Sequence, residues 1–511
     1  MKKLLIAVSA FIAFSAQAQT NTLLDQSFWQ GQPDVTQVKA QVEKGSSASQ
    51  FNNSSFDPVV MAINAQAPTE TIKYLIDQPG NSVDKLTHDG RTYLHWAANR
   101  GNAEVVEYLL KKGSKVNILD SHGTTPLLFA AASGQPNTKI YDLLLSHGDN
   151  LKKNLNQDGG NALLVAIAND KDLALTNYFV GKGLDLNSTD AAGNNAFSYA
   201  ARSGNLELLK TLVQKGVKPN QTAILMAAQS GGGRRGGSNT GAGLPLYQYL
   251  ESLNISPTAT NKSGANILHY IARKPNQSEI INYFLSKGVD VNKADEDGNT
   301  PLMNAAAGNR DTTVIGLLLP KVKNINQTNL KGETALAMAV RSNSAEAVAY
   351  LLNKGADVKA LDKNGNNLAF YLMESYRPQG QGLTGPAAPQ GGTSRQDDFD
   401  AKLNVLKGKG LDLASPQKNG NTLYHLAIAK NDIGLLKRLQ PLGIEVNTKN
   451  AEGLTALHKA AMVAKDDAMM KYLLSIGAKK EAVTNFKETA FDLASENESL
   501  SKKNVSVNFL K

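Results

Sequence analysis

A glycine that returns at a nearly constant interval constrains the fold of this 511-residue chain more than any other feature. Neighbouring members of the series are mostly 33 to 36 residues apart, and the glycines are Gly90, Gly123, Gly159, Gly193, Gly264, Gly298, Gly332, Gly365, Gly420 and Gly453. A fixed period of this length indicates a solenoid, in which one supersecondary unit is stacked many times. The sequence therefore predicts one elongated repeat body rather than several globular domains.

Each period carries the same succession of turn, helix, loop and helix. A pair such as Asp89-Gly90 predicts a tight turn, and a threonine two residues later, here Thr92, can cap a helix with its hydroxyl. A small pair follows, as at Ala97-Ala98, which lets neighbouring helices approach closely. A second segment then has its apolar residues on one helical face and ends at another glycine.

This pattern resembles the ankyrin repeat family. The family motif Thr-Pro-Leu-His-x-Ala is matched except for its proline at residues 92–97 and 455–460. The resemblance implies an all-α-dominated repeat solenoid of stacked helix–turn–helix units with hairpin-like fingers. We expect about twelve repeats over 54–485, an N-terminal cap or half repeat over 19–53, and a C-terminal capping repeat over 486–511.

Two repeats are longer than the others. Glycine-rich insertions are predicted at 231–243 and 376–396, both between the two helices of a repeat. Because they leave the repeat at the same phase, we expect both to project from one edge of the stack. Arg234, Arg235, Tyr376 and Arg377 are the candidate loop contacts to a partner.

The first eighteen residues are typical of a secretory signal peptide. Lys2 and Lys3 precede an apolar run, and Ala16-Gln17-Ala18 provides a cleavage site. The run is too short to span a bilayer, which needs about 20 residues, and no later stretch approaches that length. Since the chain has no cysteine, lipid attachment after the signal is excluded. We expect a periplasmic or secreted product with no membrane span and no lipid anchor.

The chemistry-bearing residues form no recognisable active site. The absence of cysteine excludes thiolate metal ligands and a cysteine nucleophile. The resemblance implies that one histidine in each of four repeats hydrogen-bonds a neighbouring loop: His95, His269, His425 and His458. The glycines of 231–236 match a dinucleotide fingerprint only in letters, because that fingerprint needs a preceding strand. We predict no enzyme activity, no catalytic or metal site and no cofactor.

A basic stripe is the candidate binding surface. The resemblance implies that the two residues after each small pair face the concave side of the stack, and six of them are basic: Arg100, Arg202, Arg273, Lys274, Arg341 and Lys430. These positions are either a solvated face or a contact for an acidic partner. The net charge of +9 is too dilute in a chain of this size to indicate nucleic acid.

The most favoured function is therefore non-catalytic protein–protein interaction in the bacterial envelope, with the chain acting as a monomeric scaffold. One alternative is an accessory or protective factor for an envelope or stress-defence enzyme. A weaker alternative is the binding of an acidic polysaccharide, which would use the same basic stripe. Glycan sites favour exposed aromatic platforms, and the chain has only two tryptophans, Trp29 and Trp96.

Overall fold

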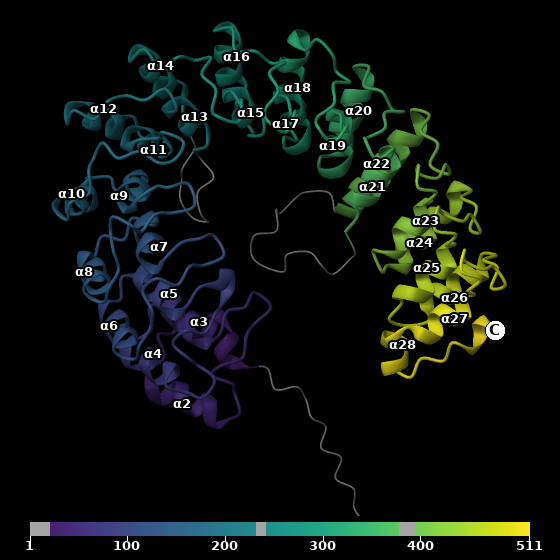
Figure 1. Cartoon of the computed structure of the whole chain (residues 1–511), viewed down its shortest axis with the longest axis horizontal. Helices are drawn as coiled ribbons and strands as arrows, with labels where there is room; N and C mark the ends of the chain where they lie inside the picture. The colour runs from purple at the N-terminus through teal and green to yellow at the C-terminus, as the bar shows by residue number, and fades with distance from the viewer. Residues whose placement is uncertain (1–20, 231–241, 378–394) are drawn as a thin grey trace, which may run out of the picture. The chain divides into compact units, whose positions relative to one another are not determined.

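The structure is a computed structural model that describes residues 21–230, 242–377 and 395–511, with side chains in the last segment described from 398 onward. Figure 1 shows paired helices joined by turns, and their contacts divide the chain into two units, Met1–Ile255 and Ser256–Lys511. Every named element in the described residues is helical, and isolated bridges such as Thr189–Asn195 tie some of the fingers. The predicted solenoid class is confirmed. The predicted signal peptide lies outside the described residues.

In the first unit, first and second helices alternate along the chain. A short 3-10 turn, Thr22–Leu24, and α1 (Gln26–Gln30) precede the repeats. The first helices are α3 (Pro58–Asn64), α5 (Tyr93–Arg100), α7 (Pro126–Ala132), α9 (Ala162–Ala166), α11 (Ala196–Ala201) and α13 (Ala223–Ala228). The second helices are α2 (Val35–Glu43), α4 (Thr69–Ile76), α6 (Ala103–Lys111), α8 (Thr138–Ser146), α10 (Ala174–Gly181), α12 (Leu206–Gln214) and α14 (Leu244–Ser252).

The second unit repeats this arrangement. Its first helices are α15 (Ile267–Ile271), α17 (Pro301–Gly308), α19 (Ala335–Ser342), α21 (Leu368–Ser375), α23 (Leu423–Ile428), α25 (Ala456–Val463) and α27 (Ala490–Glu496). Its second helices are α16 (Ser278–Ser286), α18 (Thr312–Leu318), α20 (Ala345–Asn353), α22 (Arg395–Gly408), α24 (Ile433–Leu439), α26 (Ala468–Ser475) and α28 (Glu498–Lys502). Helix α22 begins two residues inside the predicted insertion at 376–396, so the insertion is shorter than expected at that end.

The two rows of helices differ in how much of their surface is buried. The first helix α7 is buried along nearly its whole length, from Pro126 to Ala131. The second helix α6 buries one face only, formed by Val105, Val106, Leu109 and Leu110. First helices contact the first helices of adjacent repeats, and second helices do the same. A helix buried on most sides fits a central row, and an amphipathic helix fits an outer one.

Caps and turn glycines begin most of the repeats as the sequence predicts. The Thr125 hydroxyl accepts a hydrogen bond from Leu128 N at 3.2 Å, and Thr334 does the same for Ala337 N at 3.2 Å. Gly298 has a φ of +80°, and a Cβ there would lie 2.8 Å from the backbone nitrogen of Leu330 in the next finger. Glycine at position 298 is therefore required both by its backbone conformation and by the close stacking of fingers.

None of the helices in the described ranges is both long enough and apolar enough to cross a membrane.

Candidate functional site

The basic stripe predicted from sequence lies at the C-terminal ends of first helices. Arg202, Arg273 and Arg341 each stand seven residues after the residue that caps their helix, in α11, α15 and α19. Arg100, Lys274 and Lys430 each stand eight residues after the corresponding cap. A cation here also interacts favourably with the negative end of the helix dipole, so the position has a structural as well as a binding explanation.

Three of the arginines are exposed. Arg100, at the end of α5, donates from Nε to Asn64 Oδ1 in the preceding repeat at 3.0 Å. Arg202 and Arg273 are exposed at the ends of α11 and α15. Arg100 and Arg202 belong to the first unit and Arg273 to the second. Among the described residues no carboxylate forms an ion pair with any of the three, so these guanidinium groups can reach a partner without first breaking one.

The other three basic residues are engaged within the second unit. Arg341 forms an ion pair with the buried Glu333, and its guanidinium lies 5.6 Å from the centre of the Tyr371 ring. Lys430 Nζ lies 3.7 Å from Glu374 Oε1. Lys274 is half-buried, and this burial lowers its pKa. An acidic partner would compete with Glu333 and Glu374 for two of these cations, so the exposed arginines are the stronger candidates.

The structure describes two of the four candidate loop contacts, Tyr376 and Arg377. Arg234 and Arg235 lie outside the described residues. Tyr376 is buried: its hydroxyl donates to Asp432 Oδ2 at 2.5 Å, and its ring meets Phe399 of α22 edge-on at 5.3 Å. The expectation that Tyr376 contacts a partner from a loop is therefore wrong, because the side chain belongs to the core of its repeat.

Arg377, the next residue, is exposed. Its Nη1 donates to the carbonyls of Glu374 and Tyr376 at 3.0 and 3.1 Å. Of the four predicted loop contacts, Arg377 is the one that the structure describes at the surface.

The four repeat histidines share one geometry, which confirms the bonding implied by the family resemblance. In His95, Nδ1 accepts the backbone N–H of Thr92 at 3.2 Å, and Nε2 lies 3.0 Å from the Thr124 carbonyl in the next finger. The same two contacts recur at His269, His425 and His458. Because Nδ1 accepts, Nε2 carries the proton and donates.

Burial keeps these rings neutral. Desolvation lowers the pKa of His95 to about 4, although the hydrogen bond to the Thr124 carbonyl acts to raise it, and desolvation lowers the pKa of His269, His425 and His458 as well. A neutral imidazole fixed by two hydrogen bonds fastens one repeat to the next, and both of its nitrogens are occupied. In the described part of the chain, no group of three His, Cys, Asp or Glu side chains is placed to hold a metal ion.

Comparison with known proteins identifies the same repeats along most of the chain. The family model for ankyrin repeats matches residues 59–155, 138–223, 268–362 and 401–505, which together cover well over half of the sequence. The chain belongs to the ankyrin repeat family.

The relatives of this ankyrin-repeat protein are diverse. It is 25% identical over 321 residues to the E3 ubiquitin-protein ligase KEG of Arabidopsis thaliana, covering 57% of this chain and 19% of the ligase. It is 28% identical over 435 residues to the human transient receptor potential cation channel subfamily A member 1, covering 75% of this chain and 36% of the channel. An ankyrin repeat protein of Rickettsia felis is 24% identical over 300 residues, 56% of this chain and 70% of that protein.

This ankyrin-repeat protein thus spans about a fifth of the plant ligase and about a third of the channel. Ankyrin repeats indicate a role in protein–protein interaction. Two of these distant relatives are named as enzymes. One is the plant ligase, and the other is the phosphocholine transferase AnkX of Legionella pneumophila, which is 28% identical over 219 residues.

Sequence reasoning missed a buried polar network at the start of the ankyrin stack. Asp57 is fully buried, accepts a hydrogen bond from the Tyr93 hydroxyl at 2.6 Å and pairs with Lys85 Nζ at 2.7 Å. Arg91 bridges Asp89 and Asp120, each at 2.9 Å. The members of these networks lie up to 36 residues apart. The repeat period is the one sequence signal that could have paired them.

Proposed function

We propose that this ankyrin-repeat protein is a non-catalytic scaffold of the bacterial envelope that binds an acidic protein partner through exposed arginines at the ends of its first helices. The observation that carries the proposal is the exposure of Arg100, Arg202 and Arg273 at the C-terminal ends of first helices, in contrast to the ion-paired Arg341. Cations of this kind increase the rate of association and select for partners of opposite charge.

The repeat architecture supports a binding role over a catalytic one. Histidine is a common catalytic residue, but the four repeat histidines are buried. Both nitrogens of each ring are engaged in hydrogen bonds, as at His95, so neither is available to a substrate. Location in the envelope rests on the N-terminal sequence, in which two lysines, an apolar run and Ala16-Gln17-Ala18 follow one another. We therefore propose a periplasmic or secreted mature protein that begins at Gln19.

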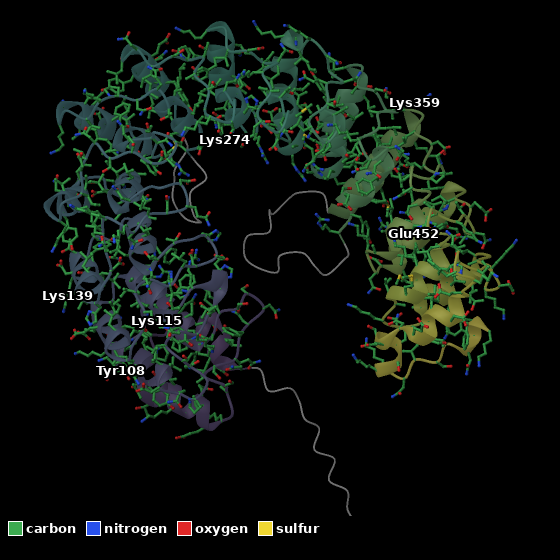
Figure 2. All side chains as sticks on the ribbon, viewed as in Figure 1. Tyr108, Lys115, Lys139, Lys274, Lys359 and Glu452 are labelled. Carbon is green, nitrogen blue, oxygen red and sulfur yellow. The ribbon has the colours of Figure 1, made fainter. Side chains whose placement is uncertain are left out.

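Affinity capture from an envelope extract of the host tests the binding role. Tagged wild type is compared with R100E/R202E/R273E and with the matched triple K139E/K215E/K359E, which makes the same charge change at exposed lysines elsewhere in the repeats. Lys139 and Lys359 are labelled in Figure 2, where they lie at the edge of the ribbon. The arginine triple should lose an acidic protein that the lysine triple retains, with the largest difference at low salt.

Two results would contradict this proposal. Equal capture by both triples would show that the arginines are a solvated face. Recovery of an acidic polysaccharide in place of a protein would favour the glycan-binding alternative.

A further inference from the structure

Four consecutive fingers of the first unit expose a large apolar side chain at one and the same repeat position. Phe51 is 41% exposed, Leu86 and Leu119 are each 58% exposed, and Leu155 is 44% exposed. We call these four residues the apolar finger row. The next finger has Thr189 at this position, so the row ends there.

The turn that follows each residue shows that the four positions are structurally equivalent. Each apolar residue directly precedes the residue that closes the finger by donating its backbone N–H to the carbonyl four residues later. The closing residues and their N···O distances are Asn52 (2.8 Å), Thr87 (2.9 Å), Asp120 (3.0 Å) and Asn156 (3.0 Å). Because the same turn is closed in the same way, the preceding side chains occupy the same place in each finger.

Neighbouring fingers are joined to one another, which makes the row continuous. His88 N donates to Ser55 O at 2.9 Å, and Ser121 N donates to Asp89 O at 2.8 Å. A Cβ on Gly123 would fall 2.7 Å from the Gln157 side chain, so the third and fourth fingers are also in contact. Packed helix layers are about 10 Å apart, and the row therefore places one apolar side chain about every 10 Å.

The row is not explained by packing within the unit. Single exposed leucines are normal on any surface, and Leu361 in the second unit is one, at the same repeat position and also 58% exposed. Its neighbours at this position are Thr328 and Pro416. Four large residues in four successive fingers instead form a patch on the order of 400 Å², a size at which exposed apolar patches are often functional.

Two cations beside the row are paired within the fold. Lys85, which precedes Leu86, pairs with the buried Asp57 at 2.7 Å and covers the Phe51 ring at 4.5 Å. Arg91 is held by Asp89 and Asp120. These two cations are therefore held within the fold, whereas the four apolar side chains remain exposed to a partner. A patch of this size is also about half of the ~800 Å² per partner that a stable protein dimer buries, which favours a short segment as occupant.

We propose that the apolar finger row binds an extended polypeptide segment in the polyproline II conformation, with an apolar side chain at every third residue. Polyproline II has three residues per turn and rises about 3.1 Å per residue, so every third side chain points the same way at about 9.3 Å intervals. This interval is close to the spacing of about 10 Å between apolar side chains of neighbouring fingers. A β-strand alternates its side chains with period two, so residues three apart point to opposite faces.

This site is separate from the exposed arginines of the proposed function. The row lies on the fingers, whereas Arg100 and Arg202 lie at the ends of first helices. Loss of acidic-partner binding in R100E/R202E/R273E and loss of peptide binding in a row variant are therefore independent results.

Fluorescence anisotropy with synthetic peptides tests the proposal. The probe is a labelled peptide of four Leu-Pro-Pro units, and the control is a peptide of the same composition with its four leucines adjacent. Wild type should bind the periodic peptide at least about tenfold more tightly. In L86S/L119S this affinity should fall about a hundredfold, because each of the two leucines removed from an apolar contact costs about a factor of ten.

The matched control is L361S, which removes a leucine of equal exposure at the same repeat position outside the row. It should bind the peptide like wild type. Urea midpoints followed by tryptophan fluorescence should be unchanged in L86S/L119S, since exposed substitutions rarely shift stability by more than about 0.5 kcal/mol, and this verifies folding. Equal affinity for both peptides, or full binding by L86S/L119S, would overturn the proposal. So would wild-type self-association that L86S/L119S abolishes, because a second copy would then cover the row.

Discussion

Acid should weaken the N-terminal repeats through His95, and the substitution H95Q should remove much of that effect. The ring of His95 is fully buried, with Nδ1 accepting from Thr92 N and Nε2 facing the Thr124 carbonyl. Protonation would place a hydrogen on Nδ1, directly against the Thr92 N–H. Folding in acid therefore requires either a strained, charged ring or loss of the hydrogen bond that Nδ1 accepts from Thr92 N.

The magnitude follows from the pKa of His95, which burial lowers from 6.5 to about 4. In the unfolded chain the ring has its ordinary pKa, so between pH 6.5 and 4 the unfolded state binds more protons than the folded state. Stability is then fully present above pH 6.5 and is lost as the pH falls toward 4. The full difference is about 3 kcal/mol, of which about 2 kcal/mol is lost by pH 5.

Urea unfolding followed by tryptophan fluorescence measures this loss locally. The chain has two tryptophans, Trp29 and Trp96, both buried in the first unit, and Trp96 follows His95 directly. The signal therefore reports the N-terminal repeats rather than an average over the stack. Comparing pH 7.5 with pH 5 keeps most carboxylates ionised, which limits their contribution.

H95Q provides the decisive comparison, because glutamine at this helical position can accept from the cap N–H without titrating. The variant should be less stable than wild type at pH 7.5, yet lose little further stability at pH 5. H147Q, at an exposed histidine, should keep the wild-type pH dependence. If H95Q loses as much stability between pH 7.5 and 5 as wild type, the buried ring is not the acid-sensitive group and the reasoning fails.

Three further predictions concern the buried contacts and the absence of a metal requirement. D57N should destabilise the N-terminal repeats by about 3–5 kcal/mol in urea titrations, because it leaves Lys85 without its buried partner; a loss below about 1 kcal/mol would contradict this. Y376F should lower the stability of the second unit by about 1.5–3 kcal/mol in calorimetry, since it removes the hydrogen bond to the Asp432 carboxylate; an unchanged transition would show that this bond contributes little. Thermal melts with and without chelator should coincide, and a large drop with chelator would reveal a structural metal.

The repeat period made the fold predictable, because each element is specified locally. Cap residues such as Thr125, turn glycines such as Gly298 and the apolar face of α6 all act within one repeat or between neighbours, so spacing alone locates them. The role of the repeat histidines was implied by the family resemblance, and the structure confirms it. Tyr376 was misassigned because it directly precedes a Pro- and Gly-rich segment. Its partners, Phe399 and Asp432, lie on helices beyond that segment.

The candidate binding surface was harder to predict, because position in the repeat does not determine what neighbouring repeats present to a side chain. Arg202 and Arg341 occupy the same helical position, yet Arg202 is exposed while Arg341 is neutralised. The difference arises from Glu333, a buried acid in the finger that opens the Arg341 repeat, and from Tyr371 in α21, the first helix of the next repeat. Counting basic residues at one repeat position in the sequence therefore overstates the positive charge that a partner meets. The charge available to a partner depends on each basic residue together with the acids of the adjoining finger and of the neighbouring repeat, as the pairs Arg341–Glu333 and Lys430–Glu374 show.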